Sequence, residues 1–323
     1  MSIRIIGTGS YLPDRILSNS DIAKNGVQTS DEWVQKNLGI VTRRIAADDQ
    51  VTSDLALNAS IKALEASGIE ASELDAIIVA TSSPDRISPS TACILQDKLK
   101  ANGCCAFDIN AVCTGFVYGL TLASSMLSQN QFNKILLVGA ETYSRITDWD
   151  DRQCVYFGDG AGAVIIEASP TGFFDFDLGA DGSGKEYFTV RGGGSEYPAD
   201  YNTVEDGRHY FDMIGRKIFE FATNALPKSI KKVLSRNSIS TTEVGIVLPH
   251  QPNINILKKV SEDTNIPVDK VQICLDKIGN TAGASVPIAL DWALRDGKIA
   301  TGDLVLMTAV GSGMTWGTAI MRW

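Results

Sequence analysis

This chain repeats the same order of landmarks in its first and second halves. Three pairs of segments carry the repeat, each pair about 166–169 residues apart: 75–81 with 243–249, 108–113 with 274–279, and 135–140 with 304–309. A steady offset predicts two structurally similar halves, which we place at residues 1–170 and 171–323, with chance similarity among short apolar strands as the alternative. If the halves are duplicates, equivalent strand ends could converge on one pocket.

Strands and helices alternate along the chain. Six apolar, β-branched runs are predicted strands: 3–6, 76–79, 135–138, 164–166, 245–248 and 304–307. A helix is predicted over Thr52–Ser67, because its apolar residues recur at helical spacing and Gly68 follows as a stop signal. Continuous apolar strands that alternate with helices are typical of buried sheets in an α/β protein.

The composition excludes several classes of function. With 29 basic and 38 acidic residues, the 323-residue chain has a formal net charge of −9, the wrong sign for general binding to nucleic acid or anionic membranes. No apolar run approaches the roughly 18–20 residues of a membrane helix, and the first residues lack the pattern of a secretion signal. Six cysteines without a CxxC pair and only two histidines provide no zinc site. We therefore expect a cytoplasmic protein with reduced thiols and no metal.

Cys113 is the candidate nucleophile. It follows a short extended segment, 108–112, and precedes a helical pattern that starts near Phe116. At a helix N-terminus, free N–H groups and the helix dipole favour a thiolate, which can lower a cysteine pKa from about 8.5 into the range of about 3.5–7.5. The sequence therefore predicts a reactive thiol, with a buried core cysteine as the alternative.

Three further polar residues lie where strands meet loops or helices. His250 follows the predicted strand 245–248, where a side chain can point a ring nitrogen into a cleft. Asn280 is surrounded by small residues that leave its carboxamide uncovered. Ser312 stands between two glycines in a predicted tight turn, which can present a backbone N–H to a ligand. A structural histidine and a turn asparagine are the alternative interpretations.

Together, four motifs in this order resemble the β-ketoacyl-[acyl carrier protein] synthase III family. They are the segment around Cys113, HQPN at 250–253, GNTAGAS around Asn280, and the terminal GSGMTWG. The resemblance runs from TSDEW near the start to the last residue. It implies the thiolase fold, an α/β architecture of five layers (αβαβα) built from two similar halves, and a homodimer. It implies no cofactor, because acyl-CoA is a substrate.

The resemblance also implies a reaction. The family loads an acyl group from acyl-CoA onto the cysteine, here Cys113, and condenses it with malonyl-acyl carrier protein or malonyl-CoA as CO2 leaves. Sulfur suits the loading step, since one thioester is exchanged for another. The backbone N–H groups of Cys113 and Ser312 would stabilise the oxyanion, and neutral N–H donors on His250 and Asn280 would face the enolate oxygen. We therefore expect an acyltransferase of fatty acid or specialised metabolism.

Single positions distinguish this chain from related enzymes. Degradative thiolases use a second cysteine in the C-terminal glycine turn, and residues 311–317 contain none. Elongating synthases carry a second histidine where Asn280 stands, whereas plant-type polyketide synthases share the three residue types and remain an alternative. The same scaffold would also suit an acyltransferase to an oxygen or nitrogen nucleophile, or a non-catalytic partner subunit. Retention of Cys113 argues against the non-catalytic subunit.

The resemblance assigns the CoA-binding positions as well. Trp33 and Arg152 match the residues that sandwich the adenine, where an indole and a guanidinium provide stacking faces. Asn253 matches a position near the pantetheine arm, and Phe219 is a candidate for the same channel. Core packing is the alternative for Trp33 and Phe219, and pairing with Asp151 is the alternative for Arg152.

The chain departs from the family pattern at Ser88 and at several surface charges. Ser88 stands where acetyl-primed members often have a bulky residue that closes the acyl pocket, so we expect tolerance of longer primers. Basic residues expected around the tunnel mouth are replaced at Glu220, Asn255 and 262–263, and the lysines at 258–259 compensate in part. Because charge complementarity governs partner choice, we expect the acceptor to be a different carrier protein, a CoA thioester or a small nucleophile.

Overall fold

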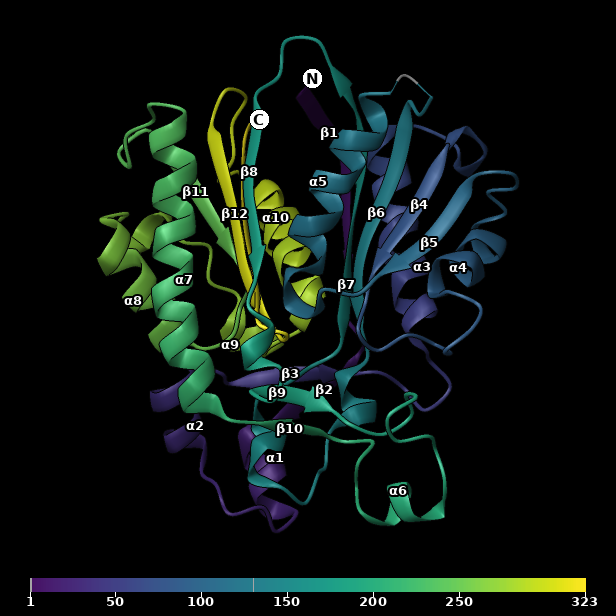
Figure 1. The fold of residues 1–323 in the computed structure, drawn as a ribbon, viewed down its shortest axis with the longest axis vertical. Coiled ribbons are helices and arrows are strands. Elements are labelled where there is room, and N and C mark those ends of the chain that lie inside the picture. The colour runs from purple at the N-terminus through teal and green to yellow at the C-terminus, as the bar shows by residue number, and fades with distance from the viewer. Residues whose placement is uncertain (1, 130) are drawn as a thin grey trace.

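The computed structural model describes residues 2–129 and 131–323, which form alternating layers of helix and sheet (Figure 1). Two main sheets stand side by side. Helices lie between them and on both outer faces: α5 (Gly115–Leu127) and α10 (Ser285–Arg295) inside, α3 (Thr52–Ser67) and α4 (Thr91–Leu99) on one side, α7 (Gly215–Arg236) and α8 (Ile254–Thr264) on the other. The predicted α/β class and its αβαβα layering are confirmed.

The larger sheet has the strand order β1-β7-β6-β4-β5. Its strands are β1 (Ser2–Tyr11), β4 (Ala76–Ala80), β5 (Cys105–Ile109), β6 (Lys134–Glu141) and β7 (Gly160–Ser169). β4 pairs in parallel with β5 and β6, and β7 pairs antiparallel with β1 and β6. Every residue of β4 is buried, as expected for a central strand covered by helices on both faces.

The second main sheet has the order β11-β12-β13-β8. Its strands are β8 (Phe174–Ala180), β11 (Val244–Pro249), β12 (Leu304–Gly311) and β13 (Thr315–Arg322). β11 pairs in parallel with β12, and the other pairs are antiparallel. Two small sheets complete the strands: β2 (Arg15–Ser18) with β3 (Thr42–Ile45), and β9 (Phe188–Val190) with β10 (Phe211–Met213).

Short helices and 3-10 turns connect these layers. The short α-helices are α1 (Asn19–Lys24), α2 (Asp31–Leu38), α6 (Tyr201–Glu205) and α9 (Leu275–Ile278). The 3-10 turns are η1 (Ala71–Glu73), η2 (Val112–Thr114), η3 (Tyr143–Ile146), η4 (Arg152–Val155), η5 (Gly182–Gly184), η6 (Val268–Lys270) and η7 (Ala282–Ala284). No helix in the described ranges has the length and hydropathy needed to cross a membrane.

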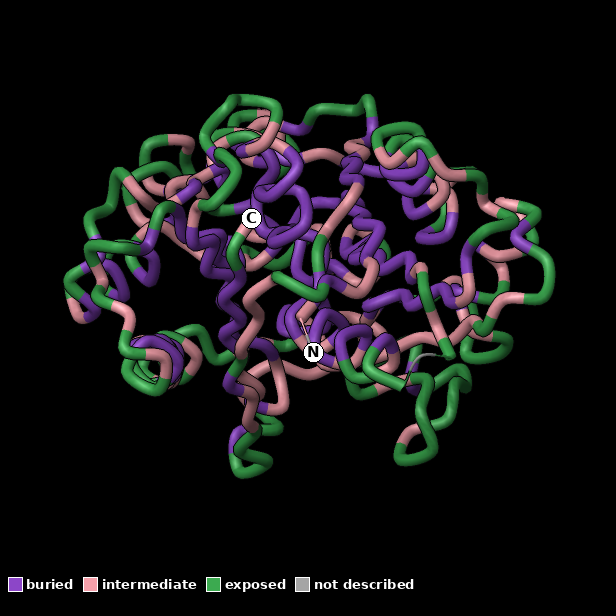
Figure 2. The backbone as a smooth tube through the Cα atoms, turned by 90° about the horizontal axis from the view of Figure 1, so that it is seen from above, coloured by how far each residue is buried: buried purple, intermediate pink, exposed green. Residues whose placement is uncertain are grey.

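Local sequence signals account for the bounds of α3 and for the positions of six strands. Helix α3 has the predicted bounds, and Gly68 ends it in the left-handed conformation with φ = 69°. The six predicted strands lie within β1, β4, β6, β7, β11 and β12. Figure 2 shows that the buried backbone is concentrated in the interior, where the layers pack against one another.

The structure extends the observation of a repeat. The series η2, α5, β6 recurs as η7, α10, β12, and each second member begins about 170 residues after the first. In both series a 3-10 turn leads into an inner helix, and the chain then enters a central strand. The larger sheet is built from residues 2–169 and the smaller from 174–322. The division of the chain at residue 170 stays a prediction.

Candidate active site

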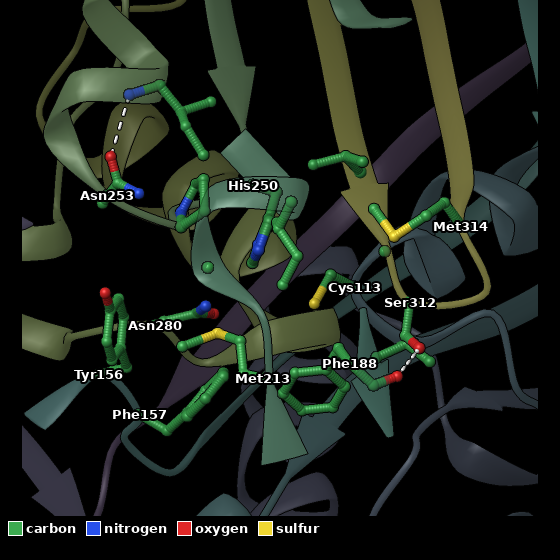
Figure 3. A pocket seen from close by; sticks show the side chains of 17 residues that line it. Cys113, Tyr156, Phe157, Phe188, Met213, His250, Asn253, Asn280, Ser312 and Met314 are labelled. Carbon is green, nitrogen blue, oxygen red and sulfur yellow. Dashed lines mark hydrogen bonds between the residues drawn. The ribbon is translucent and has the colours of Figure 1, made fainter. Parts of the chain in front are cut away.

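Cys113, His250, Asn280 and Ser312 line one open cavity of about 620 Å³. They come from four different connections: the turn before α5, the end of β11, the turn after α9, and the loop between β12 and β13. Figure 3 shows the first three side chains around the same space. Most of the remaining lining is apolar, with Phe157, Phe188, Met213, Ile218 and Met314 among its members. The structure thus brings together the four residues that the sequence singled out for chemistry.

Cys113 is 9% exposed and lies in the 3-10 turn η2, just before the first residue of α5. Burial raises the pKa of its thiol, the negative charge of Glu141 raises it further, and the backbone N–H of Cys113 opposes both effects. The expected lowering of this pKa is therefore wrong for the unliganded site, because removal of the sulfur from water outweighs the helix terminus. The thiol is protonated before substrate binds.

His250 follows β11 directly, and its backbone N–H donates to the carbonyl of Thr308 on the neighbouring strand at 2.8 Å. Burial lowers the pKa of the imidazole to about 3, so the ring is neutral. Its Nδ1 lies 2.8 Å from Oγ of Ser285, which also lies 2.7 Å from the carbonyl oxygen of Ala282. The direction of this one hydroxyl proton therefore decides which ring nitrogen carries hydrogen, and Nε2 is left to face the cavity.

Asn280 is held on both sides by backbone hydrogen bonds. Its N–H donates to the carbonyl of Tyr156 at 2.9 Å, and its carbonyl accepts from the N–H of Gly158 at 3.0 Å. The side-chain Oδ1 accepts from the N–H of Ala282 at 2.8 Å. Because Oδ1 is engaged in this way, the Nδ2 amide group is the part that faces the cavity as a hydrogen-bond donor.

Ser312 contributes its backbone to the cavity. Its hydroxyl donates to the carbonyl of Phe188 at 2.5 Å, so this proton is not available to a ligand in the cavity. Within the ranges that the structure describes, the Ser312 N–H has no hydrogen-bond partner. An unpartnered N–H at a cavity wall is the kind of group that stabilises an oxyanion.

The predicted CoA-binding residues are divided between the cavity and the surface. Asn253 lines the cavity, but its Oδ1 also caps α8 by accepting from the N–H groups of Asn255 and Ile256, each at 3.0 Å. Trp33 and Arg152 lie outside the cavity lining and contact each other, with the guanidinium 4.1 Å from the centre of the indole ring. An adenine between them would have to separate this stacked pair.

Two further predicted positions, Phe219 and Ser88, are absent from the cavity lining. Phe219 is 37% exposed, and its neighbour Ile218 lines the cavity instead, because successive residues on a helix point about 100° apart. Ser88 is exposed on the connection between β4 and α4, so it does not line the acyl pocket of its own chain. Glu141 and Ser285 were not predicted from the sequence, although Glu141 follows a predicted strand and could have been found as a polar strand end.

No cluster of three or more histidine, cysteine, aspartate or glutamate side chains suited to a metal ion occurs in residues 2–129 and 131–323. The site instead consists of a thiol, a neutral imidazole, a carboxamide and backbone N–H groups. This set can attack a carbonyl and stabilise negative charge on oxygen.

Comparisons with known proteins agree on one family. The model of 3-oxoacyl-[acyl-carrier-protein (ACP)] synthase III matches residues 107–182, and that of its C-terminal part matches 234–323. The β-ketoacyl-[acyl-carrier-protein] synthase III of Xanthomonas campestris pv. campestris is 45% identical over 322 residues, which cover 99% of this chain and 98% of that protein. The crystal structure of 3-oxoacyl-[acyl-carrier-protein] synthase III from Aquifex aeolicus VF5 is 41% identical with a TM-score of 0.92 and full coverage of both chains. The priming β-ketosynthase of the R1128 polyketide pathway superposes with a TM-score of 0.91 at 27% identity, covering 99% of this chain and 96% of that one.

Proposed function

Because this chain belongs to the 3-oxoacyl-[acyl-carrier-protein] synthase III family and is a condensing enzyme that transfers acyl groups, we propose that Cys113 carries the acyl group between its two half-reactions. Acyl-CoA is the donor, a malonyl thioester is the acceptor, and no cofactor takes part. The convergence of Cys113, His250 and Asn280 on one cavity carries this proposal. Because all three residues are present in this cavity, the structure gives no support to a non-catalytic partner subunit.

In the loading step, the sulfur of Cys113 attacks the acyl carbonyl of acyl-CoA. A carbon–sulfur bond to Cys113 forms, the bond to the CoA sulfur breaks, and CoA leaves with that electron pair. The CoA sulfur takes up the proton that the Cys113 thiol loses, so the step yields an acyl thioester on Cys113 and free CoA thiol. The N–H groups of Cys113 and Ser312 stabilise the oxyanion of the tetrahedral intermediate, and one such donor contributes about 2.7–4 kcal/mol.

In the condensation step, the bond between the malonyl carboxylate and methylene carbons breaks and CO2 leaves. The electron pair stays behind as an enolate, whose oxygen faces Nδ2 of Asn280 and Nε2 of His250. An N–H on Nε2 requires the Ser285 hydroxyl, which donates to the carbonyl oxygen of Ala282 at 2.7 Å, to turn and donate its proton to Nδ1 instead. The enolate carbon attacks the acyl carbonyl, and Cys113 leaves as a thiolate that takes a proton from water.

Mass spectrometry of the intact protein after mixing with acyl-CoAs tests the proposed function. We expect one acyl adduct per chain, followed by release of CO2 and loss of the adduct when a malonyl thioester is added. An adduct that transfers to an oxygen or nitrogen nucleophile without CO2 release would instead establish the acyltransferase alternative. No adduct with any acyl-CoA would contradict both.

The surface charges around the cavity bear on which malonyl thioester the enzyme accepts. Near the cavity mouth, Glu220 pairs with Arg216 at 2.9 Å, and the amide of Asn255 donates to the backbone of Asn37. Lys259 pairs with Asp263 at 2.5 Å, which neutralises one of the two compensating lysines. Because these acidic partners offset the charges of Arg216 and Lys259, which could otherwise steer an acidic carrier protein, we propose a specialised synthase with weakened carrier-protein docking.

We expect the kcat/KM values for malonyl-CoA and malonyl-acyl carrier protein to differ by less than about tenfold, because charge steering acts mainly on the association rate. Steady-state CO2 release with each substrate at low and at physiological ionic strength measures this ratio. A strong preference for the carrier protein that disappears at higher salt would contradict the proposal.

Trp33→Ala is expected to raise the KM for acyl-CoA about tenfold with little change in kcat, since the stacking face binds ground and transition states equally. The matched control is an acyl-N-acetylcysteamine, which contains the thioester but no adenine. Its KM should be the same for the wild-type protein and the variant. An equal rise in KM for both substrates would place the effect of Trp33 in packing rather than in nucleotide binding.

We also propose that the protein is a cytoplasmic homodimer. Strand β5 lies at the open edge of the larger sheet, where its backbone groups are free to pair with another strand. Ile87, beside Ser88, is 89% exposed, and Tyr201 on α6 is 79% exposed. A second copy that covers these residues would also determine what Ser88 contacts, so the expected tolerance of primers longer than acetyl stays a prediction.

A further inference from the structure

Glu141 is a fully buried carboxylate at the end of β6 that the proposed mechanism does not use. Its two oxygens accept from the N–H and hydroxyl groups of Ser82 and Ser83, at distances of 2.5–3.2 Å, and from the hydroxyl of Thr81 at 3.3 Å. The backbone of Gly283 packs against the carboxylate, and its N–H lowers the pKa of Glu141. Glu141 therefore joins the loop after β4 to the turn η7, which lies in the other half of the chain.

The internal repeat shows where this carboxylate stands. The turns η2 and η7 are equivalent, and each begins with a non-glycine residue in the left-handed region, Val112 with φ = 49° and Ala282 with φ = 43°. In this alignment Gly283 takes the place of Cys113. Glu141 at the end of β6 takes the place of Gly311 at the end of β12. In the first half, Glu141 thus occupies the position that Gly311, directly before the Ser312 N–H, occupies in the second.

The packing around Gly283 is too tight for a side chain. A Cβ at this position would lie 3.1 Å from Oε1 of Glu141 and 3.2 Å from the carbonyl oxygen of Val112. The turn that contains Cys113, the turn that follows Asn280 and the Glu141 carboxylate therefore meet in direct contact. Left-handed residues such as Val112 and Ala282 persist only where the surroundings hold them in place.

We propose that Glu141 is a positioning residue that holds the Cys113 turn and the Asn280 turn together. Its negative charge adds to the burial of the sulfur in opposing ionisation of the Cys113 thiol before substrate binds. The proposal rests on the function given above for its effect on condensation, but its effect on the thiol is independent of any substrate. Because Ala282 orients the Asn280 amide through Oδ1, movement of η7 is expected to disturb condensation more than loading.

The electrostatic environment of Glu141 supports this role. Burial raises the pKa of Glu141 to about 7, against the lowering effect of its hydrogen-bond donors. The titratable groups that face it are Cys113 on η2 and Tyr143 on η3, and the charge of Glu141 raises the pKa of both. No cation pairs with Glu141 in the described part of the chain. Its charge therefore acts on the thiol without compensation.

Glu141→Gln removes the charge and nearly preserves the shape. We expect the pH of half-maximal alkylation of Cys113 by iodoacetamide to fall by about one unit. Alkylation should be about tenfold faster between about pH 7, above which Glu141 is charged in the wild-type protein, and that midpoint, and unchanged at lower pH. Acyl loading from acyl-CoA should be preserved or faster near neutral pH. Condensation by the preloaded acyl-enzyme in a single turnover should be at least about tenfold slower, since an amide cannot accept from all of the Ser82 and Ser83 groups that fix the carboxylate against η7.

Two further variants separate this role from a loss of stability. Asp291→Asn removes another buried carboxylate, whose partners Thr8, Ser10 and Arg295 belong to neither turn, and should leave the alkylation profile unchanged. Gly283→Ala retains the charge of Glu141 but pushes on the turn, so it should slow condensation without shifting alkylation. This variant also tests the proposal if Glu141→Gln does not fold.

Three results would overturn the proposal: an unchanged alkylation profile in Glu141→Gln, an equal slowing of loading and condensation in that variant, or wild-type condensation in Gly283→Ala. Failure of the proposed function is a different outcome. In that case the wild-type protein forms no acyl adduct, while the alkylation profiles of the wild-type protein and Glu141→Gln still report whether the carboxylate acts on the thiol.

Discussion

Replacement of Cys113 by alanine is expected to abolish both the acyl adduct and product formation, a loss on the order of 10⁴-fold or more. Cys113 lines the cavity together with His250 and Asn280, and the structure provides no other thiol among the described lining residues. Without the sulfur, the acyl group has no covalent carrier between the two half-reactions. Intact mass after mixing with acyl-CoA, and CO2 release from a malonyl thioester, measure the two losses separately.

The control for this experiment is Cys105→Ala. Cys105 is an exposed thiol at the start of the edge strand β5, so it is open to nonspecific acylation by a reactive thioester. Its replacement should leave the adduct and the turnover unchanged. If the adduct persists in Cys113→Ala and disappears in Cys105→Ala, the acyl group is carried outside the cavity and the proposed mechanism is wrong.

The sequence was sufficient to predict the parts of the fold that depend on local signals. The bounds of α3 follow from helical spacing and from Gly68, whose left-handed conformation ends a helix without the strain of a side chain. The repeat predicted related halves, and the structure contains two equivalent series of turn, inner helix and strand. Cys113, His250 and Asn280 were found because each stands where a predicted strand or turn meets a helix or loop, and because their motifs resemble those of one family. The structure places all three on one cavity.

The reactivity of Cys113 could not be predicted in this way. A pattern of residues near 113 identifies the start of an inner helix, but burial and a neighbouring charge determine the pKa of the thiol. That charge belongs to Glu141 on β6, which reaches Cys113 only through the pairing of strands and the packing of two turns. Such contacts between segments far apart in the chain have no signature within either segment.

The remaining differences arise from orientation. Phe219 and Ile218 are adjacent in the sequence, and only the rotation of α7 against its neighbours decides which of them lines the cavity. Trp33 and Arg152 lie in α2 and η4, and the structure stacks them directly on each other at 4.1 Å. The sequence identified two stacking surfaces but had no information on whether they lie open or in contact before a nucleotide binds.

Asn280→Ala is expected to slow condensation by about 10²–10³-fold while acyl loading changes by less than about threefold, because the carboxamide meets only the enolate. Single-turnover CO2 release from the preloaded acyl-enzyme measures the first rate, and adduct formation measures the second. Asn280→Asp separates donor chemistry from support of the turn: its oxygen can still accept from the N–H of Ala282, but its second oxygen would repel the enolate instead of donating to it. A loss at least as large as in the alanine variant is therefore expected. Near-normal condensation in Asn280→Asp would mean that Asn280 only holds the backbone, and His250 would then have to supply the N–H donation alone.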